Sequence, residues 1–146
     1  MNAIISKKLE HASKLEIYSE IIRKQGHEII ANKLLEISKN EKEHVKLLFE
    51  SKKIDLKKLL TEFSNTENEL HNLKDDSINR KIAEKISDID AIHEKTILML
   101  LKDLNENRLH KKDYFVNWKC SKCGFTNNSK ESPKKCPLCN NNRFLH

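Results

Sequence analysis

The chain has 146 residues, of which 34% are charged and 37% hydrophobic, and its formal net charge is +6. This length allows one domain with a small appended module. Only two glycines and two prolines are present, so the Lys-, Glu-, Leu- and Ile-rich sequence favours long helices. No apolar run reaches the length of a membrane span, and no secretory signal precedes the first helix, which predicts a cytoplasmic protein without a membrane partner.

Hydrophobic periodicity predicts four helices, over residues 2–24, 28–52, 55–73 and 78–105. Gly26 is the predicted end of the first helix, and the short break there predicts an antiparallel hairpin with the second. Two alternatives remain for the third helix: it is continuous, or it breaks at residues 64–66 and restarts at a capping box beginning with Thr66. Ser77 is the predicted N-cap of the fourth helix.

Each predicted helix has an apolar stripe that we expect to face the interior of a bundle. In the first helix the stripe consists of Ile5, Leu9, Ala12, Leu15, Ser19 and Ile22. In the second helix it consists of Ile30, Leu34, Ile37, Glu41, Val45 and Leu48. In the fourth helix it consists of Ile82, Ile86, Ile89, His93, Ile97, Leu100 and Leu104.

Two Cys-x-x-Cys pairs lie near the end of the chain, Cys120 with Cys123 and Cys136 with Cys139. This spacing is typical of a four-thiolate site for iron or zinc. Two disulfides are the alternative, which the lack of a secretory signal disfavours. The sequence therefore predicts a helical domain over residues 1–106, a connector over residues 107–117 and a metal-binding domain over residues 118–146.

The segment from residue 114 to the end contains six basic residues and one acidic residue. A basic segment of this kind can bind nucleic acid. It can also offset the negative charge of a metal–thiolate centre. The alternative to a redox function is therefore a zinc ribbon on a helical bundle, used without catalysis to bind a partner or nucleic acid. The aromatic residues near the cysteines are explained by packing, so nucleic acid is the less favoured partner.

Carboxylate and histidine side chains interrupt the apolar stripes of three helices: Glu41, His44, Glu67, Asp90 and His93. Such residues bind pairs of iron or manganese ions in four-helix bundles. In the first helix, however, the residue that faces Glu41 is Lys8. Its ammonium group cannot bind a cation and can form an ion pair with Glu41 instead. The bundle is therefore predicted to hold two metal ions, one, or none.

Residues 24–28 and 40–44 resemble the first hairpin of the rubrerythrin family. Residues 118–125 and 132–139 resemble the rubredoxin-like end of that family nearly position for position. The sequence around Ile92 and His93 resembles the family's fourth helix, in an alignment that makes Glu94 the metal ligand rather than His93.

The resemblance implies a mainly α fold: a four-helix ferritin-like bundle followed by a small rubredoxin-like domain. It implies iron at the four cysteines, a redox partner protein and a homodimer. It also implies iron in the bundle, hydrogen peroxide as substrate and a function in oxidative stress. The chain is an oxidoreductase of this kind only if the bundle site is competent. Three departures bear on that site: Lys8 replaces the family's first-helix glutamate, the segment between the second and fourth helices is short, and Asp90 or Ala91, depending on the alignment, stands where a glutamate is expected.

Overall fold

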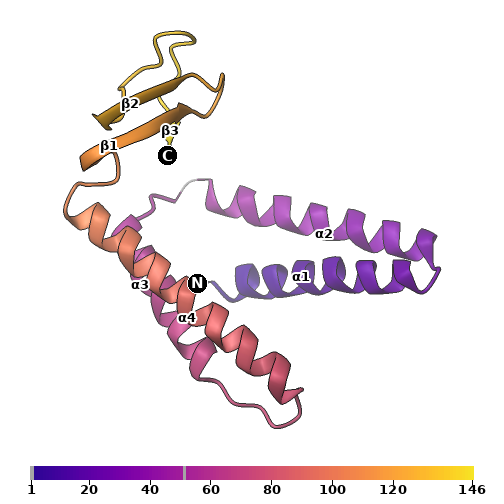
Figure 1. Ribbon diagram of the computed structural model, residues 1–146. Coiled ribbons are helices and arrows are strands. Elements are labelled where there is room, and N and C mark those ends of the chain that lie inside the picture. The colour runs from indigo at the N-terminus through magenta and orange to yellow at the C-terminus, as the bar shows by residue number, and fades with distance from the viewer. Residues whose placement is uncertain (1, 51) are drawn as a thin grey trace. The chain divides into compact units, whose positions relative to one another are not determined.

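The computed structural model describes residues 2–50 and 52–146, and it contains four helices followed by a small sheet (Figure 1). The helices are α1 (Ala3–Lys24), α2 (Glu28–Phe49), α3 (Leu56–Asn72) and α4 (Arg80–Asn105). The strands are β1 (Lys111–Cys120), β2 (Thr126–Glu131) and β3 (Phe144–Leu145). This order confirms the predicted mainly α fold, and it is consistent with a helical bundle followed by a rubredoxin-like domain.

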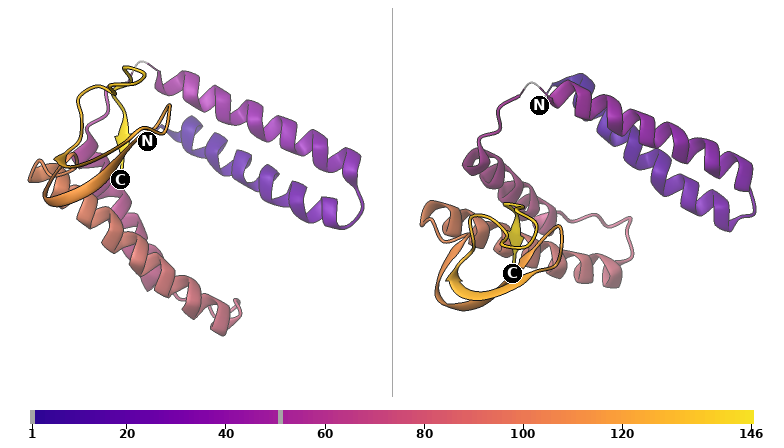
Figure 2. Two further views of the ribbon diagram at one scale, coloured as in Figure 1. Left: turned by 45° about the horizontal axis from the view of Figure 1, so that its top comes forward. Right: turned by 90° about the horizontal axis from the view of Figure 1, so that it is seen from above.

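The chain divides into two compact units, residues 1–53 and residues 54–146. The first unit is the antiparallel hairpin of α1 and α2. The second contains the antiparallel hairpin of α3 and α4 together with the sheet. The views in Figure 2 show the two helices of each hairpin running side by side.

Gly26 makes the tight turn between α1 and α2, as the sequence predicted. Its φ is +89°, a backbone conformation that strains any residue with a Cβ. Its N–H donates to the carbonyl of Arg23 and closes the last turn of α1. At the other end, α2 stops at Phe49 rather than residue 52, since the N–H of Lys52 closes a turn on the Phe49 carbonyl. Residue 51 lies outside the described part of the chain.

Small side chains line the contact between α1 and α2. The residues buried there recur every seventh position: Ile5, Ala12 and Ser19 in α1, and Ala31, Ser38 and Val45 in α2. Ala12 and Ser38 are at most 1% exposed. The Ser38 hydroxyl donates to the Ala12 carbonyl across the contact, at 2.8 Å. Small residues at these positions let the two backbones approach closely enough for that hydrogen bond.

The hairpin contacts leave several residues of the predicted inner stripes of α2 and α4 uncovered. Ile30, Ile37 and Leu48 of α2 are 44–53% exposed. In α4, Ile82, Ile86 and Ile89 are 50–55% exposed. The physical reason is that each hairpin contact takes the smaller or more polar residue beside the stripe, such as Ala31, Ser38 or Ser87. The large apolar residues therefore lie on the flank of each hairpin.

The helix α3 is continuous, so the alternative of a break at residues 64–66 was wrong. The hydroxyls of Ser64 and Thr66 donate to carbonyls one turn earlier, which satisfies them inside the helix. The predicted N-cap of α4 was also wrong. Asn79 caps this helix by accepting from the N–H groups of residues 81 and 82, whereas Ser77 belongs to a turn closed by Asp75.

The sheet has the order β2-β1-β3 with both pairings antiparallel. Its strand β1 begins at Lys111, within the predicted connector. Buried Lys112 forms an ion pair with Asp103 of α4, at 2.9 Å. The core of the sheet is small and includes two of the four cysteines; it consists of Trp118, Cys120, Cys136 and Phe144. Packing inside this domain therefore depends directly on its cysteines.

We predict that Ser38→Leu destabilises the α1–α2 hairpin. The larger side chain forces the helices apart and removes the hydrogen bond to Ala12, at a cost of roughly 1–3 kcal/mol in the free energy of unfolding. Denaturant unfolding followed by helical circular dichroism measures this change. Ser13→Leu, the same substitution at an exposed position of α1, is the control. Equal effects of the two substitutions would contradict the close-contact explanation.

Candidate metal centres

The four cysteines lie on two loops with the same backbone design. In each loop a residue with positive φ follows the second cysteine: Gly124 at +80° and Asn140 at +62°. The N–H of Gly124 donates to the carbonyl of Cys120, and the N–H of Asn140 donates to the carbonyl of Cys136. These turns direct both sulfur atoms of each pair toward the opposite loop.

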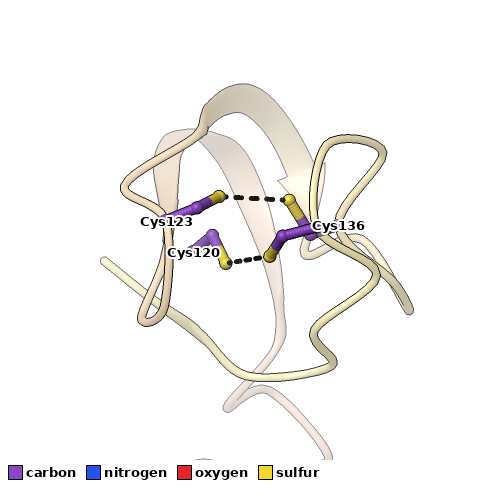
Figure 3. A group of neighbouring side chains, drawn as sticks. Cys120, Cys123 and Cys136 are labelled. Carbon is purple, nitrogen blue, oxygen red and sulfur yellow. Dashed lines mark hydrogen bonds between the residues drawn. The ribbon is translucent and has the colours of Figure 1, made fainter.

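The sulfur atoms of the two loops converge on one point (Figure 3). The Sγ atoms of Cys120 and Cys139 are 3.6 Å apart, as are those of Cys123 and Cys136. All four lie within 4.8 Å of one another, and no disulfide joins them within the described residues. Four sulfurs placed about 2.3 Å from a tetrahedral ion would be separated by roughly 3.8 Å. The arrangement therefore fits a single four-coordinate metal ion.

Backbone N–H groups point at these sulfur atoms and stabilise negative charge on them. The N–H of Cys123 lowers the pKa of Cys120 most, against the opposing effect of burial, and the Asn141 amide, the N–H of Lys122 and the Cys139 thiol lower it further, to about 6. At the second loop, burial raises the pKa of Cys136, but the N–H groups of Cys139 and Leu138, together with the thiols of Cys123 and Cys139, lower the pKa overall. The two loops thus present matching donors to a thiolate.

The pKa of Cys123 is raised to about 12. The N–H of Phe125 lowers it, but burial and the three neighbouring thiols raise it by more. Sulfurs packed this closely cannot all be negative without a cation between them. The pKa of Cys120 is lowered and that of Cys123 is raised, and neighbouring thiols contribute to both shifts because they compete to carry negative charge. Such competition is expected of four thiols that together bind a cation.

Burial is uneven around the quartet. Cys120 and Cys136 are 1–2% exposed, Cys139 is half-buried and Cys123 is exposed. The second cysteine of each pair therefore lies nearer the protein surface than the first. The side of the quartet formed by Cys123 and Cys139 is therefore the side nearest to solvent.

The α1–α2 hairpin contains the predicted ion pair. Lys8 Nζ lies 2.6 Å from Glu41 Oε2, which confirms the prediction that these side chains face each other. The Lys8 ammonium lowers the pKa of Glu41, by its hydrogen bond first and its charge second. His44 Nδ1 lies 3.8 Å from the same carboxylate oxygen. The positive charge at Glu41 is thus supplied by a lysine.

The α3–α4 hairpin brings together three predicted ligands, Glu67, Asp90 and His93. His93 Nδ1 lies 3.6 Å from Glu67 Oε2 and 3.8 Å from Asp90 Oδ1. These separations are too long for hydrogen bonds and suit ligands that share one ion. Glu67 Oε2 is a buried atom with no hydrogen-bond partner among the described residues, although buried carboxylate oxygens normally have one.

Glu94, the remaining predicted ligand, lies in a different group of side chains. Its Oε2 is 2.9 Å from His71 Nε2, and its Oε1 accepts from Asn68 at 3.1 Å. His71 was missed by the sequence analysis, although it follows Glu67 by one helical turn. That spacing was the available signal, because residues four apart on a helix share a face.

Comparison with known proteins agrees with this geometry. The rubredoxin-like domain of rubrerythrin matches residues 118–143, which include all four cysteines. Rubrerythrin of Clostridium perfringens is 30% identical, over 84% of this chain and 78% of its own length. Rubrerythrin-1 of Clostridium acetobutylicum is also 30% identical, over 87% of this chain and 80% of its own length. The chain belongs to the rubrerythrin family.

Among the described residues, no helix is both long enough and apolar enough to cross a bilayer.

We predict that Lys8→Met raises the pKa of Glu41, since it removes the ammonium that lowers it. In the native chain the lowered pKa stabilises the fold above the ordinary glutamate value of about 4.3, and this contribution is lost as the pH falls through the folded-state pKa. The variant should therefore lose stability less steeply between about pH 5 and pH 3. Carboxyl NMR titration and acid unfolding measure the two effects.

The control is Lys14→Met, which removes the equivalent partner of Glu10 on the exposed side of α1. It should raise the pKa of Glu10 and leave that of Glu41 unchanged. An unchanged Glu41 pKa in the Lys8 variant would contradict the assignment of Lys8 as its charge partner.

Proposed function

We propose that this protein transfers single electrons through an iron ion held by Cys120, Cys123, Cys136 and Cys139. Its family membership and its four-thiolate geometry support an iron-binding redox protein. The observation that carries the proposal is the tetrahedral spacing of the four sulfur atoms, supported by the N–H groups directed at them. A redox partner protein would supply the electrons, and the exposed side of Cys123 offers it access. The cytoplasm, which keeps thiols reduced, is the proposed location.

Iron is preferred to zinc because residues 118–143 match a rubredoxin-like domain. The same match does not favour the alternative of a zinc ribbon that binds a partner or nucleic acid. Zinc has no accessible redox change, so it would leave the proposed electron transfer without a mechanism. A red colour in the protein as isolated from cells would support iron, and a colourless protein containing zinc would count against it.

We further propose that Glu67, Asp90 and His93 hold a metal ion within the α3–α4 hairpin. The two hairpins have equivalent pairs, since His44 lies 3.8 Å from Glu41 as His93 lies 3.8 Å from Asp90. The third residue of each group decides whether that group favours a metal ion. Lys8 makes its group neutral with Glu41, whereas Glu67 brings its group to two negative charges and leaves an oxygen unpartnered.

Glu41 and His44 in the first hairpin, and Glu94 in the second, remain proposed metal ligands. Their participation requires a rearrangement, because Glu41 is held by Lys8 and Glu94 by His71. Without these further ligands, the two carboxylates and one imidazole of Glu67, Asp90 and His93 suit a divalent transition metal ion.

We propose hydrogen peroxide as the substrate. We also propose that the protein functions in oxidative stress. A metal ion bound by Glu67, Asp90 and His93 alone would have open coordination positions for a small oxygen-containing ligand. Reduction of one peroxide to two water molecules consumes two electrons and two protons. The four-thiolate centre would deliver these electrons singly, after each is received from the redox partner.

We predict that anaerobic reconstitution with iron loads the four-thiolate site and a second site per chain. Glu67→Gln should lose the second metal ion and peroxide turnover, because the substitution removes one of two negative charges, and it should keep the four-thiolate iron. Metal analysis, visible absorption and peroxide consumption measure these outcomes. Glu69→Gln, the same change at an exposed position of α3, is the matched control. Native protein with iron at the cysteines and no turnover would exclude peroxide reduction while keeping electron transfer.

A homodimer is the proposed assembly. The flanks of α2 and α4 expose rows of isoleucine and leucine that a second copy of the chain could cover. We predict a mass of two chains by light scattering, and a shift toward one chain when Ile82 and Ile86 are both replaced by Lys. The control replaces Lys81 and Lys85, also on α4, by Gln. A single-chain mass for the native protein would contradict the proposal.

A further inference from the structure

We propose that the side-chain amide of Asn141 raises the reduction potential of the four-thiolate centre, by donating a hydrogen bond to the sulfur of Cys120. Asn141 Nδ2 lies 3.5 Å from Cys120 Sγ, within the range for a hydrogen bond to sulfur. The same nitrogen lies 3.2 Å from Ser121 Oγ and 3.2 Å from the Arg143 carbonyl. This inference rests on the proposed iron-dependent electron transfer.

The backbone around Asn141 holds this side chain in place. The Asn141 carbonyl accepts from the N–H of Cys136 at 2.7 Å, which fixes the residue to the second cysteine loop. Its neighbour Asn140 has a φ of +62°, so the chain turns sharply before it. The amide then reaches back to the first loop, and Asn141 is thereby attached to both halves of the site.

The pairing of β1 with β3 also keeps the Asn141 side chain close to Cys120. Cys120 pairs with Phe144, and the N–H of Ser121 donates to the Arg143 carbonyl at 2.9 Å. The segment that carries Asn141 therefore cannot move away from Cys120 without breaking the edge of the sheet. Because the amide is held in this way, little conformational freedom is lost when it binds the sulfur.

The direction of the effect follows from charge. Ferric iron with four thiolates carries one net negative charge, and gaining one electron brings it to two. A donated N–H stabilises the more negative state more strongly, which raises the reduction potential. Cys120 is only 1% exposed, so water does not mask the effect of the amide at this sulfur. The other groups that contact the Cys120 sulfur are the backbone N–H groups of Cys123 and Lys122, which belong to the fold of the loop, and the sulfur of Cys139, which belongs to the quartet itself.

The experiment compares reduction potentials of iron-loaded protein by electrochemical titration. Asn141→Leu removes the donor at similar size and should lower the potential. Ser121→Ala removes a competing acceptor of the same amide, so its potential should equal or exceed that of the native protein. Asn142→Leu, the same substitution at the exposed neighbouring residue, is the control and should leave the potential unchanged.

Equal potentials for Asn141→Leu and Asn142→Leu would overturn the inference, and so would a lowered potential in Ser121→Ala. A purely structural link between the loops predicts a loss of thermal stability in the Asn141 and Ser121 variants with no change in potential. Asn141→Asp, which keeps the shape of the residue, replaces the leucine variant if that fails to bind iron, and it should also lower the potential. Native protein that binds no redox-active iron would instead refute the proposed function.

Discussion

The mutual repulsion of four closely spaced sulfur atoms is the constraint around which the C-terminal domain is built. The sulfurs lie within 4.8 Å of one another, in a domain whose buried core consists of Trp118, Phe144 and two of the cysteines themselves. So few apolar side chains supply little stability by burial alone. Binding a metal ion to such a site contributes directly to folding, because the ligand arrangement does not exist in the unfolded chain. The backbone N–H groups directed at Cys120 and Cys136 stabilise negative charge on these sulfur atoms.

The two helical hairpins also differ in their local charge, although their sequences contain similar acid-x-x-His pairs. In one hairpin, Lys8 forms an ion pair with the carboxylate of Glu41. In the other hairpin, Glu67 adds a second negative charge beside Asp90. A carboxylate with a lysine at 2.6 Å has its charge compensated without a metal ion. A buried carboxylate oxygen without a partner has no such compensation. In the proposed metal site, the charge of one residue on the neighbouring helix would therefore decide whether each acid–histidine pair favours a cation.

Close packing inside each hairpin has a second consequence for the assembly. The contact between α1 and α2 buries alanine and serine together with Ile5 and Val45 at every seventh position, whereas other isoleucines, such as Ile30 and Ile37, lie on the flank. The free energy available from burying those isoleucines is therefore not used within the hairpin. It remains available for packing against a further helical surface, which is the physical basis of bundle formation and of the proposed dimer.

The sequence by itself determined the features that depend on local spacing. The Cys-x-x-Cys turns are short-range structures, so their four thiolates could be predicted without a fold. The position of Lys8 opposite Glu41 followed from counting helical turns on either side of Gly26, and the structure confirmed it. The helices themselves were predicted to within a few residues because apolar periodicity extends over many turns.

Tertiary structure alone decided which residues meet across elements. The side of α4 that faces α3 depends on a rotation of about 100° per residue, so His93 and Glu94 could not be assigned their separate partners, Glu67 and His71, from spacing. The exposure of the isoleucine stripes likewise depended on how closely small residues let α1 and α2 approach. Asn141 became visible as a donor to Cys120 only when the sheet placed the two cysteine loops together, since contacts between distant segments have no periodic signal in the sequence.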